Sequence, residues 1–251
     1  MTTTVAEQAT TSSPVPGDRL DLLLRTLAYA RERDYTGWDY GDGMSSRLLR
    51  AFPVESTWLN LAVQEGIKRA PVNLRPLFRV EQRRNFMGAG LFAMANLEAY
   101  RLTEQEAYAR DARDLVEWLL EEYPRGYGGF CCTHPHDVQT LDGVVAAGTP
   151  GVVGTSFGVK ALLRADDHFG GGYADVAMSA ADFVFEDLGY IEVGEQARIN
   201  YKVSDDGDHY TLNANALGAR LLVDLYDHSG DTALLDAARK LLNYVASQQT
   251  D

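Results

Sequence analysis

Apolar residues recur at three- and four-residue spacing along most of the chain after Gly17. Leu20, Leu23, Leu24 and Leu27 form one such stripe. This spacing places apolar side chains on one face of an α-helix. The pattern predicts helices over 18–33, 55–69, 82–101, 104–122, 155–169, 172–187, 211–228 and 231–249. Only residues 191–204 alternate enough to predict a strand or a β-hairpin.

The last six predicted helices form three similar hairpins. In each hairpin a short turn joins two helices, and the second helix carries an alanine near its start (Ala112, Ala180 and Ala238). The connections between hairpins, 123–154 and 188–210, are much longer. Repeated hairpins that cannot bury both faces alone stack side by side. The expected fold class is therefore all-α, a stack of helical hairpins with a small β-hairpin insertion near 191–204.

The two helices of a hairpin differ in their pattern. The first is apolar nearly all round, as in MGAGLFAMA (87–95), whereas the second has a charged face, as at Arg110, Arg113 and Glu117. A helix that is apolar all round is buried, and an amphipathic helix faces water. We therefore expect the first helices to form an inner layer, with the long connections gathered on the rim where they begin. The mouth of such a ring is a common place for a ligand.

Composition fits one globular domain at 17–251, preceded by a Thr/Ser/Pro-rich tail at 1–16 that we expect to be disordered. The 251 residues are 45% hydrophobic and 24% charged, the balance of a soluble protein. No apolar stretch approaches the roughly 20 residues of a membrane span. The start, Met-Thr-Thr-Thr, lacks the features of a secretory signal. We therefore expect no membrane span and a cytoplasmic location.

The chain is acidic. Asp and Glu number 36 against 23 Lys and Arg, a net charge of −13, and very few of the cations are lysines. A large negative charge resists association, so the composition favours a protein adapted to high salt, an ordinary acidic cytosolic protein being the alternative. Nucleic acid is not an expected partner, because phosphate binding needs a basic stripe.

The two cysteines, Cys131 and Cys132, are adjacent. Neighbouring cysteines cannot join distant segments, which fits a reducing compartment without a disulfide framework. We expect them to be buried as small apolar side chains rather than to act as a nucleophile or a metal site.

The segments expected at this rim are rich in aromatic, amide and carboxylate side chains; they are residues 35–46, 71–85, 123–137 and 199–215. Aromatic faces stack on the C–H faces of sugars, and amides and acids bond to sugar hydroxyls. These segments therefore predict a carbohydrate ligand. The candidate substrate-binding residues are Trp38, Tyr40, Asn73, Arg75, Arg83, Tyr127, His134, Tyr201, His209, Asn213 and Asn215.

Asp39 and Asp42 are the candidate catalytic acids, in the segment YTGWDYGDGMSS (35–46). Hydrolysis with inversion needs two carboxyl groups roughly 6.5–9.5 Å apart. A general acid also needs a raised pKa, which burial in a cleft supplies. The alternative is that both residues cap the next helix or stabilise a glycine-containing turn.

Other candidates also have structural alternatives. His134 and His136 have the residue type of metal ligands but no evident third partner, so a surface loop is favoured and neither metal nor cofactor is expected. Arg75 and Arg83 either bind a carboxylate such as a uronic acid or pair with local acids. Asn213 and Asn215 lie at the start of the predicted helix 211–228. One of the two is expected to cap the helix, and only the other is then free to bind a ligand.

Four motifs resemble the six-hairpin glycosidase-like superfamily of (α/α)6 toroids: GWDYGDGMSS, PVNLRP, TPGVVGTSF and LNANAL. The resemblance covers about residues 30–251, and the nearest relatives it suggests are uncharacterised archaeal and bacterial proteins linked to polysaccharide or glycan processing. The superfamily includes hydrolases, epimerases and members with no known activity. The resemblance implies an inner-ring cleft that binds carbohydrate.

The pattern departs from that superfamily in helix number. A full toroid has twelve helices, whereas the pattern predicts eight, or nine if 44–52 is a short helix. We expect the domain at 17–251 to be truncated at its C-terminal end, the alternative being a partner, such as a second copy, on the open edge. Helix 211–228 should then expose an apolar flank that includes Leu212, Ala214, Ala216, Leu217, Leu221 and Leu222.

The favoured function is a carbohydrate-active enzyme, glycosidase-like or uronate-processing, acting on a cell-surface polysaccharide or an N-glycan precursor. A sugar epimerase is a further possibility within the same class. The alternative is a non-catalytic carbohydrate-binding or assembly protein of the same fold in polysaccharide biosynthesis, because fold alone does not separate the two.

Overall fold

The computed structural model describes residues 17–51, 56–205 and 210–249. The predicted tail at 1–16 lies outside them. The chain is mainly helical: α1 (Gly17–Arg31), α2 (Arg47–Ala51), α3 (Thr57–Arg69), α4 (Phe86–Thr103), α5 (Glu106–Glu122), α6 (Val152–Phe169), α7 (Tyr173–Met178), α8 (Ala180–Asp182), α9 (Leu212–Ser229) and α10 (Thr232–Ser247). A 3-10 turn, η1 (Asp42–Ser45), precedes α2, and a π-helical turn, η2 (Phe183–Asp187), follows α8.

Within the described ranges, short strands form three antiparallel pairs. The pair of β5 (Ile191–Val193) and β6 (Gln196–Arg198) is the hairpin that the alternating pattern predicts. The other two pairs were not predicted. They join β1 (Cys132–Thr133) to β4 (Pro150–Gly151), and β2 (Val138–Gln139) to β3 (Val144–Val145).

The predicted helix at 172–187 is continuous in sequence pattern but interrupted in the structure. The break falls at Ser179, whose hydroxyl donates to the Val176 carbonyl (2.7 Å) and accepts from the Phe130 amide (2.9 Å). The loop that precedes β1 packs directly on this point. Because of this contact between Phe130 and Ser179, the segment forms α7, α8 and the π-helical turn in place of one regular helix.

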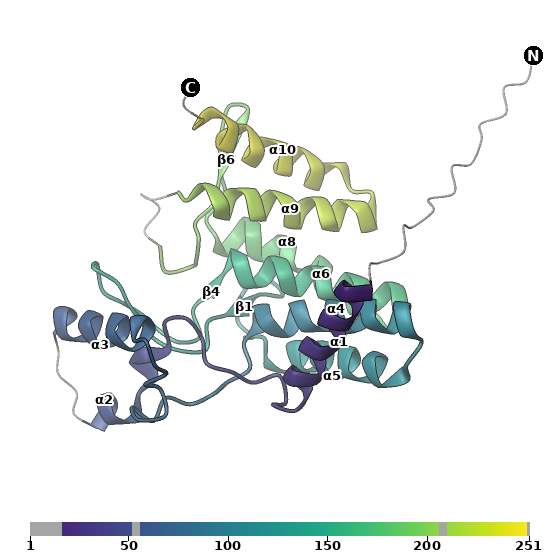
Figure 1. Cartoon of the computed structure of the whole chain (residues 1–251). Helices are drawn as coiled ribbons and strands as arrows, with labels where there is room; N and C mark the ends of the chain where they lie inside the picture. Colours follow the sequence, from purple (N-terminus) through teal and green to yellow (C-terminus); the bar gives the residue numbers. More distant parts are fainter. Residues whose placement is uncertain (1–16, 52–55, 206–209, 250–251) are drawn as a thin grey trace, which may run out of the picture.

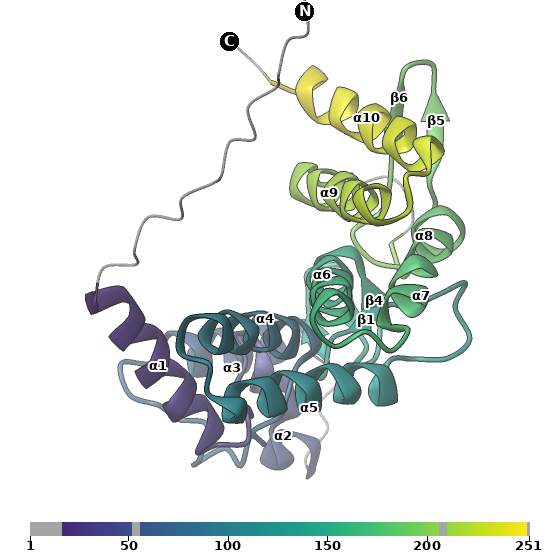
Figure 2. The same cartoon turned by 90° about the vertical axis from the view of Figure 1, so that its right-hand side faces the viewer.

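The helical hairpins form an open arc with two layers (Figure 2). Helices α4, α6 and α9 lie on the concave side and pack against one another in that order, while α5, α7–α8 and α10 lie outside them. The inner helices meet through small residues: a Cβ on Gly90 of α4 would lie 2.9 Å from the Phe157 carbonyl oxygen of α6. The predicted inner and outer layers are confirmed, as is the all-α class.

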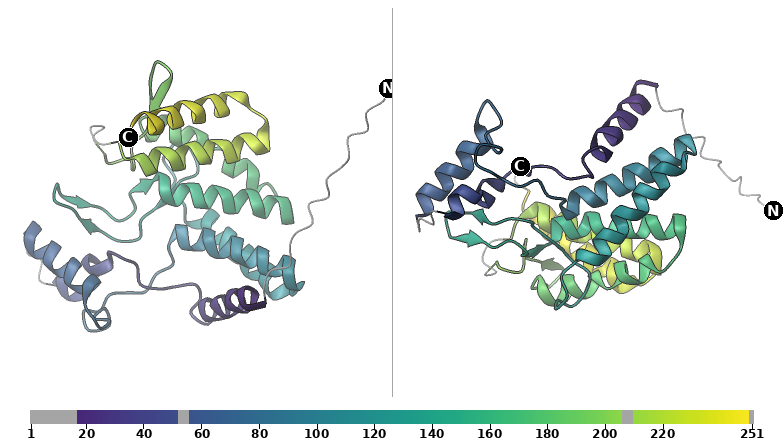
Figure 3. Two further views of the ribbon diagram at one scale, coloured as in Figure 1. Left: turned by 45° about the horizontal axis from the view of Figure 1, so that its top comes forward. Right: turned by 90° about the horizontal axis from the view of Figure 1, so that it is seen from below.

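The two ends of the helices differ as the hairpin pattern predicts. The short turns α4–α5, α6–α7 and α9–α10 lie at one end (Figure 1). The long connections with β1 and β4 lie at the other, where α4, α6 and α9 begin. Figure 3 shows α2 and α3 near the β2–β3 pair at this second end, which we call the loop rim, and η1 contacts both α3 and β2.

Helix α9 is better covered than expected. Ala214, Leu221 and Leu222 are fully buried, because α9 packs against α6 and α10 and also contacts Ile199, in the segment after β6. The expected exposed flank is therefore wrong for these three residues, while Leu212 is 41% exposed. A partner on this flank stays a prediction. Among the described residues, no helix has the length and apolar character needed to cross a bilayer.

Candidate functional site

A cavity of about 340 Å³ opens at the loop rim, where α4 and α6 begin. Its size lies at the lower end of the range typical of small-molecule sites. Apolar side chains make much of its wall, from Phe86 and Met87 of α4, Val138 and Val145 of the β2–β3 pair, and Val153 of α6. Its main polar residues are Asp39, Asn85, His134, Tyr201 and Lys202.

The start of α4 positions Asp39. The backbone of Gly37 pairs with that of Arg83, so the segment before Asp39 runs beside the segment before α4. Asn85 caps α4, since its side-chain oxygen accepts from the Gly88 amide. Its side-chain nitrogen donates to Asp39 Oδ2 at 3.1 Å. Asn85 therefore links the helix start to the carboxylate, a role that its capping position alone did not reveal.

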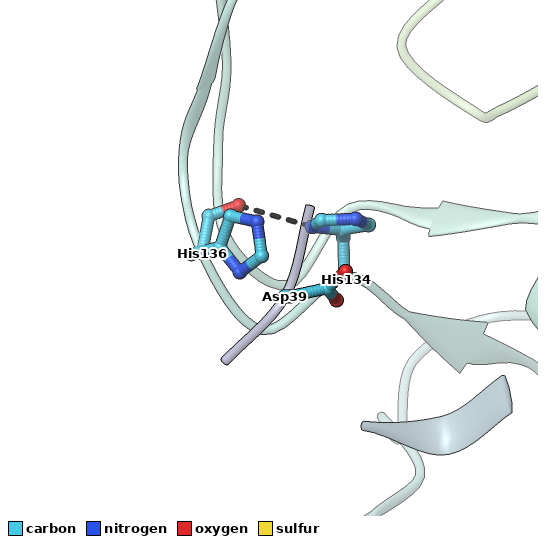
Figure 4. Close-up of side chains that lie close together, drawn as sticks. All are labelled: Asp39, His134 and His136. Atoms are coloured by element: carbon cyan, nitrogen blue, oxygen red, sulfur yellow. Dashed lines mark hydrogen bonds between the residues drawn. The ribbon is translucent and has the colours of Figure 1, made fainter. Parts of the chain in front are cut away.

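Asp39 and His134 line the cavity, and His136 lies beside them (Figure 4), with one possible ligand atom of each of the three within 4.8 Å of the others. Nδ1 of His134 is 3.4 Å from the backbone oxygen of His136. His136 is only 2% exposed, and its Nε2 has no hydrogen-bond partner among the described residues. Burial, helped by the neighbouring His134, lowers the pKa of His136 to about 4. Its imidazole is therefore neutral at physiological pH.

Asp42 does not line the cavity. Its carboxylate is buried and accepts from Arg75 Nε at 2.8 and 2.9 Å. Burial raises the pKa of Asp42, and the Arg75 guanidinium opposes that rise. Arg75 also donates to the Asp39 carbonyl at 3.0 Å. The pair therefore holds the loop that carries Asp39, and among the described lining residues Asp39 is the only carboxylate.

The two candidate arginines have partners within the protein. Arg75 is held by Asp42, and Arg83 donates to Glu81 (3.1 Å) and to the Pro135 carbonyl (2.7 Å). The sequence left open whether these arginines bind a carboxylate ligand or pair with nearby acids. In the structure both guanidinium groups pair with acids of the protein. Neither lines the cavity.

The remaining aromatic candidates lie outside the cavity lining, with the exception of Tyr201. The Trp38 indole donates to the Val80 carbonyl at 3.1 Å. Tyr40 is 71% exposed and has the Lys68 ammonium over its ring. Tyr127 packs edge-on against Phe183.

The amide candidates also lie elsewhere. The Asn73 side chain accepts from the Arg75 amide at 3.1 Å, and Asn213 is exposed at the start of α9. His209 lies outside the described residues. The structure therefore brings Asp39, His134 and Tyr201 to one cavity, whereas the other described candidates do not line it.

Asn215 is buried and bonded to the backbone, so it is not free for a ligand. Its side chain accepts from the Ile199 amide (2.9 Å) and donates to the Thr211 carbonyl (2.9 Å). Asn215→Ala should lower the free energy of unfolding by about 1–3 kcal/mol, because a buried backbone donor loses its partner. Urea unfolding measures this. Asn213→Ala, two residues away and exposed, should change it by less than about 0.5 kcal/mol. Equal effects of the two changes would contradict this role.

Comparisons with known proteins identify similar solved structures only. No protein-family model matches the chain, and no curated protein matches it significantly. A GH76 α-mannanase of Bacteroides thetaiotaomicron is 16% identical, with a TM-score of 0.49 over 68% of this chain and 46% of that chain. A D-mannose isomerase is 18% identical, with a TM-score of 0.47 over 66% and 41%. The chain spans less than half the length of either.

The Lin0763 protein from Listeria innocua matches over more of the chain. It is 11% identical, with a TM-score of 0.52, and the match covers 93% of this chain and 71% of that chain. Identity at this level shows the fold alone. The chain therefore shares the helical fold of the Lin0763 protein, and its two-layered arc of helical hairpins is the arrangement expected from the sequence.

Proposed function

We propose that the cavity at the loop rim binds a carbohydrate and that Asp39 and His134 transfer a proton on it. The observation that carries the proposal is the pairing of a carboxylate and an imidazole at the wall of a cavity of sugar-binding size. The Asn85 amide, the Tyr201 hydroxyl and the apolar wall supply the hydrogen bonds and apolar contacts that sugars need.

One carboxylate in the lining favours proton transfer over hydrolysis by two carboxylates. Hydrolysis of that kind uses one carboxyl group as acid and another as base or nucleophile. Asp42 cannot supply the second group, because it is buried in its pair with Arg75. A carboxylate base with a neighbouring imidazole acid suits isomerisation or epimerisation: Asp39 removes a proton from the carbon next to a sugar carbonyl, and His134 donates to the carbonyl oxygen.

Asp39→Asn tests this role. The change keeps the size of the side chain and removes the base, so the rate of proton transfer should fall by about 10²-fold or more. The measurement is deuterium incorporation from D2O next to the carbonyl, followed by NMR with a panel of monosaccharides and uronic acids. Asp142→Asn, in the exposed turn between β2 and β3, is the matched control and should leave the rate unchanged. Equal rates for Asp39→Asn and the wild type would remove Asp39 from the reaction.

A non-catalytic carbohydrate-binding protein is the second candidate. The observation that favours it is the largely apolar lining, which suits stacking on a sugar face. In that case the wild type would bind sugars by calorimetry without any deuterium incorporation. The finer predictions, a cell-surface polysaccharide or N-glycan precursor as substrate and adaptation to high salt, rest on the sequence resemblance and on the acidic composition.

A further inference from the structure

The buried Nε2 of His136 needs an explanation. Buried polar atoms in proteins nearly always have a hydrogen-bond partner, and each exception has a structural or functional cause. Nε2 has none among the described residues, although the side chain is only 2% exposed. The neighbouring void, lined by Asp39, Asp42 and His136, measures about 10 Å³. This volume is at the lower limit for a single water molecule.

The groups around this atom are those that bind a transition metal. We infer that Asp39, His134 and His136 form a binding site for one divalent transition-metal ion, with Zn²⁺ as the best fit. Two imidazoles and a carboxylate make a three-ligand zinc site whose fourth position is open to water. Calcium and magnesium prefer oxygen ligands throughout, so a set with two nitrogens disfavours both.

The spacing is close to that of a metal site. One possible ligand atom from each residue lies within 4.8 Å of the other two. Ligand atoms on a tetrahedral zinc ion are about 3.4 Å apart, given zinc–ligand bonds near 2.0–2.1 Å. Small rotations of the side chains, moving the atoms by about 1 Å, therefore close the site. The backbone that carries His134 and His136 is one short loop, so no rearrangement of the helices is needed.

The surrounding contacts orient the three ligands. Nδ1 of His134 lies 3.4 Å from the His136 carbonyl oxygen, a contact that holds the two imidazoles beside each other. The Asn85 amide holds Asp39 Oδ2 at 3.1 Å. Backbone carbonyls and amides bonded to the ligands in this way are the usual support of metal sites. The nearby Arg83 guanidinium opposes a cation, but Glu81 pairs with it at 3.1 Å.

The site overlaps the proposed acid–base pair. An ion bound by Asp39 would occupy the carboxylate lone pair that removes the proton, and an ion bound by His134 would take the place of the proton that His134 donates, so ion binding and proton transfer exclude each other. This consequence rests on the proposed function, whereas ion binding itself does not.

Calorimetric titration of the full chain with ZnCl2 tests the inference. We expect one ion per chain, released by a chelator, and a Co²⁺ complex with the visible absorption of tetrahedral coordination. His136→Gln and Asp39→Asn should each weaken Zn²⁺ binding by roughly tenfold or more, as the loss of a ligand or of its support does. His228→Gln, at the exposed end of α9, is the matched control and should not change it.

Circular dichroism melts establish that each variant is folded, and His134→Gln replaces any variant that is not. Zn²⁺ binding that is absent, or equally strong in the wild type and both ligand variants, overturns the inference. The outcomes for the two proposals are separable. Deuterium incorporation without added metal tests the proton transfer, and the zinc titration without sugar tests the ion site.

Discussion

Gly129→Ala should destabilise the protein by more than about 3 kcal/mol, at the upper end of the cost of overpacking a core. A Cβ at this position would overlap the carbonyl of Ser179. Neither segment can easily move away. The next residue, Phe130, is fully buried, and its amide donates to the Ser179 hydroxyl at 2.9 Å. Urea unfolding followed by circular dichroism measures the loss.

Gly66→Ala provides the control for Gly129. Gly66 lies on the exposed side of α3, and a Cβ there meets no atom within 4 Å. Alanine in place of glycine within an exposed helix should stabilise the protein by up to about 1 kcal/mol. A Gly129→Ala protein as stable as the wild type would mean that the loop before β1 does not pack on Ser179 as described.

Arg75→Met should lower the free energy of unfolding by about 3–5 kcal/mol near neutral pH, because it leaves the buried carboxylate of Asp42 without its partner. The Asp42 side chain is 4% exposed and that of Arg75 is 16% exposed. Burial already raises the pKa of Asp42, and losing the guanidinium raises it further. A carboxyl group with a raised folded-state pKa costs stability above its unfolded pKa, so the deficit should shrink as the pH falls toward that value.

Arg69→Met is the matched control, because Arg69 forms an exposed pair with Glu65 at 2.9 Å and its side chain is 76% exposed. Its loss should cost less than about 1 kcal/mol. The double change Arg75→Met with Asp42→Asn should recover part of the loss, since no unpaired charge then remains. A deficit that persists undiminished at low pH would show that the charge of Asp42 is not its cause.

The long helices were predictable because each buries several of its own apolar residues, whereas the short helix α2 buries none. The pattern predicts a helix over 211–228, and α9 spans Leu212–Ser229. The two-residue strands are too short to show any period. Strands β1 and β4 form because the segments at Cys132 and Gly151 meet, and β2 and β3 pair with each other across a local turn. The break at Ser179 likewise depends on a contact with Phe130, far earlier in the chain.

The candidate site was predictable in residue type more than in arrangement, and its role stays a proposal. Asp39, His134 and Tyr201 were chosen from the sequence because they lie in rim segments rich in polar and aromatic residues, and all three line the cavity. The pairing of Asp42 with Arg75 joins residues far apart in sequence, which spacing does not reveal. The sequence disfavoured a metal role for His134 and His136 because no third ligand lies near them, whereas Asp39 reaches them only in the folded chain.

The separation of short turns and long connections at opposite ends of the stack has an evolutionary consequence. Tight turns join paired helices at one end, so their sequences are constrained by the packing they maintain. The connections at the loop rim begin and end on helices that are already held by their hairpin partners. Such segments tolerate insertion and replacement at little cost in stability. Descendants of this chain can therefore acquire new ligand preferences by exchanging rim loops while inheriting the same helical stack.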